Sequence, residues 1–331
     1  MRQGLPLFVS LFNTRLSFEM ENELKPIHKR TRLLTGLAGL IAIRLLSAQD
    51  TPQQIPAPVK KAMFWKVSSK DNVVYLLGSI HAGNKEMYPL AKEIEAAFEE
   101  SSTLAVEADI LHIDQQKIQA FMMKGMYEGE DNLWNHINDE TKARMEKACE
   151  LLAMACAPLG KMKPWLLSVM LPSMAMMKNG MDPKYGIDRH FLELAAKSPA
   201  TKRILEIEGA EFQFKMLSNL ESSLQEESLG SALAQMDTLK ELFRTMREIW
   251  TSGDAEAMDA WVTKYMTGSQ QMRKLMLEGR NPAMADAAET LLKGEGHGFV
   301  VVGAGHLVGK EGLAALLAAR GYKVEQVALR H

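Results

Sequence analysis

One pattern occurs twice in this chain of 331 residues: a short apolar run, then Gly, two further residues and His. The first copy occupies residues 73–81 and ends at His81, and the second occupies residues 299–306 and ends at His306. Both runs are rich in β-branched and aromatic residues and lack polar alternation, which is typical of buried strands. Glycine lets the backbone leave the sheet. Each histidine is therefore predicted just past the carboxyl end of a strand, where ligands bind in open parallel α/β sheets.

The residues after each histidine continue in the same order. An amphipathic run at residues 89–98 precedes a second apolar stretch at 103–106, and a run at 313–317 precedes one at 322–327. The sequence therefore predicts an α/β fold in which two β-Gly-x-x-His-α-β half-units form the sheet core. A single Gly-x-x-His arises readily by chance, whereas two copies, each after a predicted buried strand, constrain the fold strongly.

The long middle of the chain, residues 111–275, has mostly helical periodicity, and we expect a large helical insertion that caps the edge of the sheet. Many methionines fall between Met145 and Met181. We interpret them as core residues, and the alternative is an adaptable hydrophobic groove for a peptide or lipid-like ligand. Cys149 and Cys156 would lie about 10 Å apart along one helix, so buried thiols are expected rather than a disulfide.

The N-terminal region has the layout of an export signal followed by a linker. Basic residues at 25–32 precede an apolar core at 33–43 and small residues at 47–48, and a polar, Pro-rich spacer follows at 49–60. A positive region, a short apolar core and small residues at the cleavage point are the three parts of a secretory signal. The apolar core is too short to span a bilayer comfortably.

These features predict a leader at residues 1–48 and a catalytic domain at residues 61–331. Met1 or Met20 could be the true start, and the second would give a leader of ordinary length. An exported chain works in the periplasm or outside the cell, with possible membrane proximity through the leader. The alternatives are an uncleaved anchor or a buried helix.

Two carboxylates follow the predicted strand at residues 103–106. Glu107 and Asp109 have the same parity, so on a regular strand their side chains face one side. If this strand neighbours the one that leads to His81, Glu107 lies near that imidazole at the same edge of the sheet. A carboxylate beside an imidazole suits a metal site or an acid–base pair. The alternative is a solvated strand end with unrelated charges.

Other polar residues receive separate interpretations. Arg280 opens a predicted helix, from which it could reach an anionic group or hold a substrate carbonyl; the alternative is a surface arginine. Asp188 is interpreted as a helix-start residue, and His190 as a surface or internally satisfied histidine. His297 precedes the second buried strand and is expected at the opposite edge of the sheet from His306, which makes it a poor co-ligand.

Six short motifs carry a resemblance to a known family. They are Leu-Leu-Gly-Ser-Ile-His (76–81), Val-Glu-Ala-Asp (106–109), Gly-Ile-Asp (186–188), Leu-Glu (205–206), Arg-Asn (280–281) and Val-Val-Gly-Ala-Gly-His-Leu-Val-Gly (301–309). Together they resemble the TraB/GumN family, which includes the TIKI metalloproteases, over about residues 60–330. More distantly the chain resembles the erythromycin esterase-like hydrolases. The resemblance implies an α/β core and hydrolysis dependent on manganese or cobalt, with site residues at His81, Glu107, Arg280 and His306.

The sequence thus predicts an exported metal-dependent hydrolase, in the first place a peptidase acting on a peptide or protein. His81 and His306 would bind a divalent cation, Mn or Co, with Zn also compatible. Glu107 would be a third ligand or the base for an activated water. Arg280 would stabilise the developing oxyanion.

Two other classes of function remain open. The chain could be a non-catalytic envelope module whose helical cap binds a peptide or pheromone-like ligand, or an esterase that uses a histidine as base without a metal. The net charge of −2 gives no reason to expect nucleic acid as a partner. Animal TIKI proteins act on secreted signalling proteins, whereas this leader looks bacterial, so the identity of the substrate does not carry over.

Overall fold

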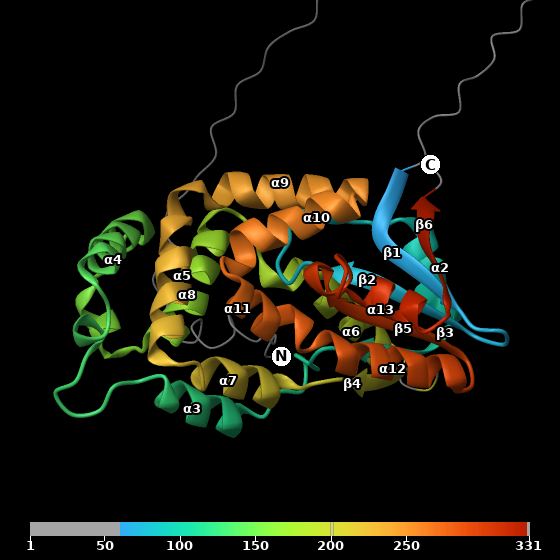
Figure 1. Ribbon diagram of the computed structural model, residues 1–331, viewed down its shortest axis with the longest axis horizontal. Coiled ribbons are helices and arrows are strands. Elements are labelled where there is room, and N and C mark those ends of the chain that lie inside the picture. Colours follow the sequence, from blue (N-terminus) through green and yellow to red (C-terminus); the bar gives the residue numbers. More distant parts are fainter. Residues whose placement is uncertain (1–59, 199, 201, 330–331) are drawn as a thin grey trace, which may run out of the picture.

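The computed structural model describes residues 60–198, 200 and 202–329 (Figure 1). The predicted leader, residues 1–48, lies outside the described residues, as does all of the spacer except its last residue. Within the described part, no helix combines the length and the apolar character needed to cross a membrane.

Six strands form one mixed sheet with the order β4-β3-β5-β2-β1-β6. In chain order they are β1 (Lys60–Ser68), β2 (Val73–Ser79), β3 (Ser101–Val106), β4 (Arg203–Glu206), β5 (His297–Gly303) and β6 (Lys323–Leu329). Strands β4, β3, β5 and β2 run parallel, and β1 is antiparallel to both β2 and β6. The protein is therefore mixed α/β, as the sequence predicts.

The two strands of the repeated motif are direct neighbours in this sheet. β2 pairs with β5 in parallel, with Ser79 opposite Gly303. On its other side β5 pairs with β3, with Val106 opposite Val301. β5 thus separates β2 from β3, so the condition under which Glu107 was expected near His81, that the two strands are direct neighbours, is not met. The crossover from β2 to β3 leaves one position open, and β5 fills it, so the carboxyl ends of all three strands meet at one edge.

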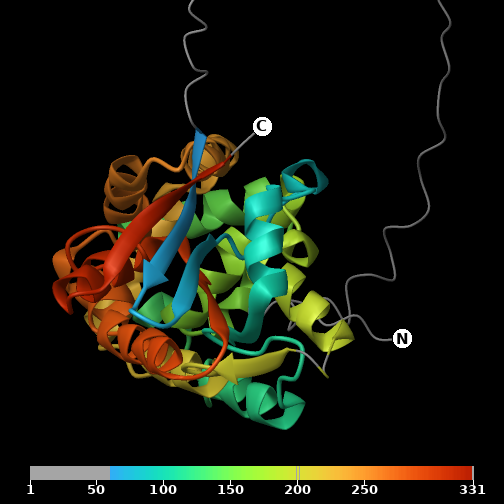
Figure 2. The same ribbon diagram turned by 90° about the vertical axis from the view of Figure 1, so that its right-hand side faces the viewer.

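Helices cover both faces of the sheet. They are α2 (Lys92–Glu100) and α6 (Ile187–Lys197) on one face, and α12 (Asn281–Lys293) and α13 (Leu313–Ala319) on the other (Figure 2). The rings of Phe98, Phe191 and Phe299 join α2, α6 and β5 with centroids 4.8–5.5 Å apart. The preceding residue of β5, Gly298, faces α12, because strand residues alternate between faces. A β-carbon there would lie 3.0 Å from Leu291.

Most of the other helices form a cap beyond the carboxyl edge of the sheet. They are α3 (Gln115–Lys124), α4 (Asp139–Leu152), α5 (Pro164–Lys178), α7 (Ala210–Ser218), α8 (Ser222–Ala234), α9 (Leu239–Ser252), α10 (Ala255–Val262) and α11 (Gln270–Arg273). In Figure 1, α4, α5 and α8 lie on the left, away from the sheet. Residues 111–275 are mostly helical, as predicted, but β4 joins the sheet and α6 packs on it. The buried Met145 and Met170 confirm that methionines in this region are core residues.

The expectation of two free thiols is wrong, because Cys149 and Cys156 form a disulfide. Helix α4 ends at Leu152, and Ala153 adopts a left-handed conformation with φ of 56°. The chain therefore turns back before it reaches Cys156, and the two Cα atoms lie only 5.6 Å apart. The predicted separation assumed one continuous helix. The sequence did not indicate that the helix ends here, because alanine, the residue at position 153, rarely adopts the left-handed conformation.

Removing this disulfide should destabilise the cap. We expect Cys149→Ala/Cys156→Ala to lower the free energy of unfolding by about 2–3 kcal/mol, the loop-closure entropy that a bridge over so short a loop removes from the unfolded chain. Urea unfolding of wild type and variant measures this difference. As a control, a reducing agent should lower the wild-type midpoint and leave that of the variant unchanged. Equal midpoints in non-reducing buffer would contradict the prediction.

Candidate active site

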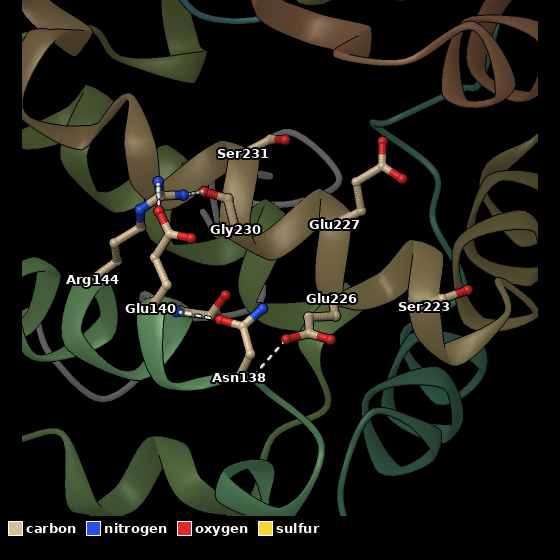
Figure 3. Close-up of a pocket in the computed structure, with 9 residues that line it drawn as sticks. Asn138, Glu140, Arg144, Ser223, Glu226, Glu227, Gly230 and Ser231 are labelled. Atoms are coloured by element: carbon tan, nitrogen blue, oxygen red, sulfur yellow. Dashed lines mark hydrogen bonds and ion pairs between the residues drawn. The ribbon is translucent and has the colours of Figure 1, made fainter.

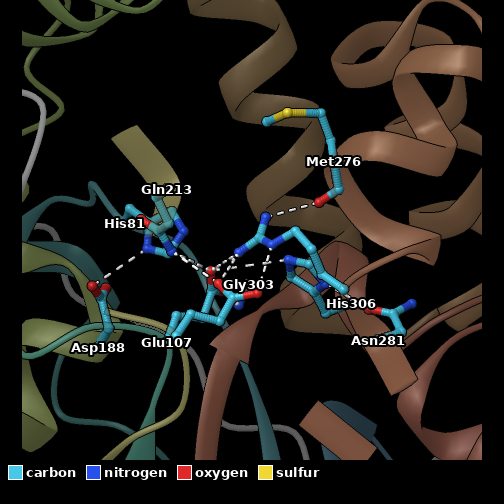
Figure 4. A network of polar contacts seen from close by, with 10 residues as sticks. His81, Glu107, Asp188, Gln213, Met276, Asn281, Gly303 and His306 are labelled. Carbon is cyan, nitrogen blue, oxygen red and sulfur yellow. Dashed lines mark hydrogen bonds and ion pairs between the residues drawn. The ribbon is translucent and has the colours of Figure 1, made fainter. Parts of the chain in front are cut away.

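The two predicted histidines and Glu107 meet at the carboxyl edge of the sheet. They follow the neighbouring strands β2, β5 and β3, and Figure 4 shows His81, Glu107 and His306 grouped around Gly303. A β-carbon at Gly303 would lie 3.4 Å from Glu107 Oε1 and 3.6 Å from both His81 Nε2 and His306 Cδ2. The space above this glycine is therefore shared by all three side chains, and the two distant motifs contribute to one cluster.

Glu107 is a buried carboxylate with three donors. Its Oε1 accepts from the Gly303 N–H at 2.6 Å, and its Oε2 accepts from Arg280 Nη2 at 2.7 Å and Gln213 Nε2 at 3.1 Å. Burial raises the pKa of Glu107, but the imidazoles of His306 and His81, Arg280 and the Gly303 N–H outweigh it and lower the pKa to about 2. Glu107 therefore stays ionised at neutral pH, and it accepts a proton poorly.

His306 presents a defined nitrogen to Glu107. The side-chain amide of Asn281 donates to the Glu311 carbonyl at 2.6 Å, so its oxygen faces His306 Nδ1, also at 2.6 Å. Because that oxygen only accepts, Nδ1 carries the proton and the lone pair is on Nε2. His306 Nε2 lies 3.9 Å from Glu107 Oε2. Burial of this side chain, which is 3 % exposed, lowers the pKa of His306 to about 4, so the ring is neutral.

His81 lies on the open side of the cluster, with 59 % of its side chain exposed. Its Nδ1 is 3.3 Å from Oδ2 of Asp188, and Ser79 Oγ donates to the other Asp188 oxygen at 2.9 Å. Desolvation lowers the pKa of His81, but the carboxylates of Asp188 and Glu107 outweigh it and raise the pKa to about 9. Solvent at the exposed side screens these pairs. Asp188 does lie in the first turn of α6, as predicted, but it also orients His81, which sequence reasoning missed.

Arg280 does reach the cluster, but carboxylates of the chain itself already hold it. Its Nε and Nη2 donate to Glu208 Oε1 and Oε2 at 2.8 and 2.6 Å, and Nη1 donates to the Met276 carbonyl at 2.8 Å. Nη2 also donates to Glu107. Four of the five N–H groups of Arg280 thus donate to partners within the chain, and this geometry makes Arg280 the cation that holds Glu107.

Glu208, like Gln213, is a site residue that sequence reasoning missed altogether. It follows β4, a four-residue strand that the helical pattern of residues 111–275 concealed. Its backbone N–H donates to the Glu107 carbonyl at 3.0 Å, which continues the pairing of β4 with β3 beyond the strands. A short strand detected at residues 203–206 would have placed its side chain at this edge.

Three other candidate residues lie outside the cluster. Asp109 pairs with His112 at 2.8 Å, and its backbone N–H donates to Glu206. His190 packs on the ring of Tyr88 with centroids 4.9 Å apart, beside the aromatic core. His297 begins β5, at the opposite end of that strand from Gly303, and its exclusion from the site was predicted.

The side chains of this cluster supply the kinds of ligand atom that the predicted metals accept, but the described residues do not surround one point as a complete set of ligands. Two imidazole nitrogens and a carboxylate oxygen are ligands that Mn, Co and Zn accept. Across residues 60–198, 200 and 202–329, no group of three or more His, Cys, Asp or Glu side chains is arranged to hold a metal ion. Glu107 is turned toward Arg280 and Gln213 in this arrangement. The residues fit a metal by their chemistry and by their convergence on Gly303.

A hollow lies in the cap, between α4 and α8 (Figure 3). Its lining is polar: Asn138, Glu140, Thr141, Arg144, Ser223, Glu226, Glu227, Gly230 and Ser231. Arg144 pairs with Glu140 at 2.5 Å, and Glu226 accepts from the Asn138 N–H. None of the residues that line it belongs to the histidine cluster, and Arg144 also donates to the Gly230 carbonyl at 3.0 Å, which joins α4 to α8.

Comparisons with known proteins agree with the motifs. Residues 63–326 match the family model of the TraB/PrgY/gumN family. "Uncharacterized protein YbaP" of Escherichia coli (strain K12) is 26% identical over 244 residues, which cover 73% of this chain and 87% of that protein. An "Uncharacterized protein" of Treponema pallidum (strain Nichols) is 24% identical over 278 residues, 79% and 81% of the two chains. No solved structure matches.

Proposed function

Because that match covers most of its length, the chain belongs to the TraB/PrgY/gumN family, and from this premise we propose that it is an exported metal-dependent hydrolase that cleaves peptides. The observation that carries the proposal is the convergence of His81, Glu107 and His306 on the space above Gly303. The two Gly-x-x-His segments then act as paired halves of one site. A peptide substrate follows from the resemblance to the TIKI metalloproteases.

His81, His306 and Glu107 are the residues that would hold the ion, through the two Nε2 atoms and the carboxylate. A bound Mn, Co or Zn ion lowers the pKa of a coordinated water enough to supply a nucleophile near neutral pH. Asn281 and Asp188 fix the Nδ1 sides of the two rings, as the outer partners of metal-ligating histidines commonly do. His81 gives up its proton on binding.

Glu107 and Arg280 have separate tasks in this proposal. With its three donors, Glu107 remains a carboxylate and serves as a ligand rather than as the base. Arg280 offsets its charge and holds its Oε2, so that Oε1 stays directed at the space above Gly303. This replaces the oxyanion role that the sequence suggested for Arg280.

The Cys149–Cys156 disulfide supports the exported location in this proposal. Structural disulfides persist in oxidising compartments such as the periplasm and the extracellular space, and they are rare in the cytosol of mesophiles.

The pair of His81 and Asp188 would also suit an esterase without a metal. However, a His81 with a raised pKa is an acid rather than a base at neutral pH.

Calorimetric titration of Mn²⁺ into the chelator-stripped protein tests the proposal. We expect about one ion per chain, together with cleavage of an unstructured protein such as casein that EDTA stops and Mn²⁺ restores. Magnesium serves as the control ion, because it prefers oxygen ligands over imidazole. Tight peptide binding without turnover and without any effect of EDTA would instead support a binding module, and ester hydrolysis that survives EDTA would support the esterase.

A further inference from the structure

Two buried carboxylates share the single guanidinium of Arg280. The side chains of Arg280, Glu107 and Glu208 are 8, 10 and 5 % exposed. Glu208 accepts two hydrogen bonds from the guanidinium, because its two oxygens lie 2.8 and 2.6 Å from Nε and Nη2 along one edge. Glu107 receives only Nη2. The strongest contact of the buried arginine is therefore made to Glu208, which is not one of the predicted site residues.

The Nε–Nη2 edge is the part of an arginine that recognises anions. Its two parallel N–H groups match the two oxygens of a carboxylate or a phosphate, and the paired geometry adds specificity as well as strength. Arg280 Nη2 also contacts Glu107 at 2.7 Å, so without Glu208 this edge would be an unoccupied anion receptor beside the carboxylate of the proposed site. Glu208 fills that receptor with a carboxylate from the chain itself.

Glu208 is held in place by its surroundings. Its N–H and that of Gly209 both donate to the Glu107 carbonyl, at 3.0 and 2.9 Å. Gln213 donates to Glu208 Oε2 at 3.4 Å and to Glu107 at 3.1 Å, and so joins the two carboxylates from α7. The backbone and the side chain of Glu208 are thus both held in place. An incoming anion would have to displace the Glu208 carboxylate, which is part of the chain and cannot diffuse away.

We propose that Glu208 is a specificity-determining residue that occupies the anion-binding edge of Arg280 and so excludes carboxylate- and phosphate-bearing groups from the site. Two carboxylates facing one guanidinium also leave Arg280 no excess positive charge with which to attract a further anion. The consequence for substrates rests on the proposed hydrolase. Such a site takes internal, uncharged amide segments of a peptide rather than a free C-terminus.

Acetate binding to Glu208→Ala tests this proposal. The substitution removes the carboxylate and leaves space for a small one. We expect sodium acetate to raise the unfolding temperature of the variant saturably, with an apparent affinity at least about tenfold above any response of wild type. Sodium chloride at the same ionic strength is the reference. Glu206→Ala, two residues earlier at the exposed end of β4, is the matched control and should respond as wild type.

The double variant Glu208→Ala/Arg280→Gln identifies the receptor. It should lose the acetate response, and an undiminished response would show that acetate binds elsewhere and overturn the proposal. No response of Glu208→Ala would overturn it as well. If that variant does not fold in acetate or in chloride, Glu208→Ser, which also removes the carboxylate and leaves its space empty, replaces it under the same two criteria. All titrations contain EDTA, so a failure of Mn²⁺ binding would overturn the proposed hydrolase and leave this result unaffected.

Discussion

Replacing Arg280 with methionine should lower the free energy of unfolding by about 3–5 kcal/mol, the cost of removing one partner from a buried ion pair. The substitution keeps much of the side-chain volume and removes the only cation that contacts Glu107 and Glu208 in the described site. Two like charges would then remain buried side by side without a counter-ion. Desolvation and mutual repulsion both favour the unfolded chain, where water solvates each carboxylate.

Urea unfolding with a fitted midpoint and slope measures this loss. Arg244→Met is the matched control, because Arg244 also pairs with two glutamates, Glu241 and Glu248, but on an exposed face of α9. Exposed pairs contribute little, so its midpoint should barely move. Glu107→Gln should lower the free energy of unfolding by less than Arg280→Met does, because Arg280 keeps its ion pair with Glu208. If Arg280→Met were as stable as Arg244→Met, the buried cluster would not have the arrangement described.

The second large effect is expected at Asp188, on metal affinity. Asp188→Asn should weaken Mn²⁺ binding by about 10–100-fold, the range typical of a lost outer partner of a ligating histidine. The amide keeps the shape of the side chain, but it removes the charge that faces His81 Nδ1. His81 then loses both its orientation and the electrostatic support for its basicity.

Three further titrations decide whether this effect belongs to the site. His306→Gln removes a proposed ligand, so its loss of affinity should exceed that of Asp188→Asn. Glu193→Gln is the control, because Glu193 lies on the same helix, five residues further along, and pairs with Arg189 outside the cluster. This variant should bind Mn²⁺ as wild type does. Equal affinities of wild type and Asp188→Asn would contradict the role given to Asp188, and unchanged binding in His306→Gln would contradict the site itself.

Much of the site could be read from local patterns. An apolar run of β-branched residues predicts a buried strand wherever it lies, and the residue that ends it must emerge at the edge of the sheet. His81, His306 and Glu107 each follow such a run, and the structure brings them together. The burial of Met145 likewise follows from the apolar helical face that it shares with Ala148 and Cys149, three and four positions further along.

Several features could not be read in this way, because they depend on segments far apart in the sequence. β4 has only four residues and gains its strand character from pairing with β3. Arg280 meets Glu107 across 173 residues, and Ser79 meets Asp188 across 109. The disulfide depends on a helix that stops early at Leu152.

The sequence by itself determined the type of fold, the ends of the strands and the residues that end them, since these depend on neighbours within a few positions. The tertiary structure alone decided that β5 lies between β2 and β3 and therefore that two motifs more than 200 residues apart share one site. It also decided the partners of each polar group. A buried charge is stable only beside its counter-charge, and which residue supplies that charge depends on how distant strands and helices pack.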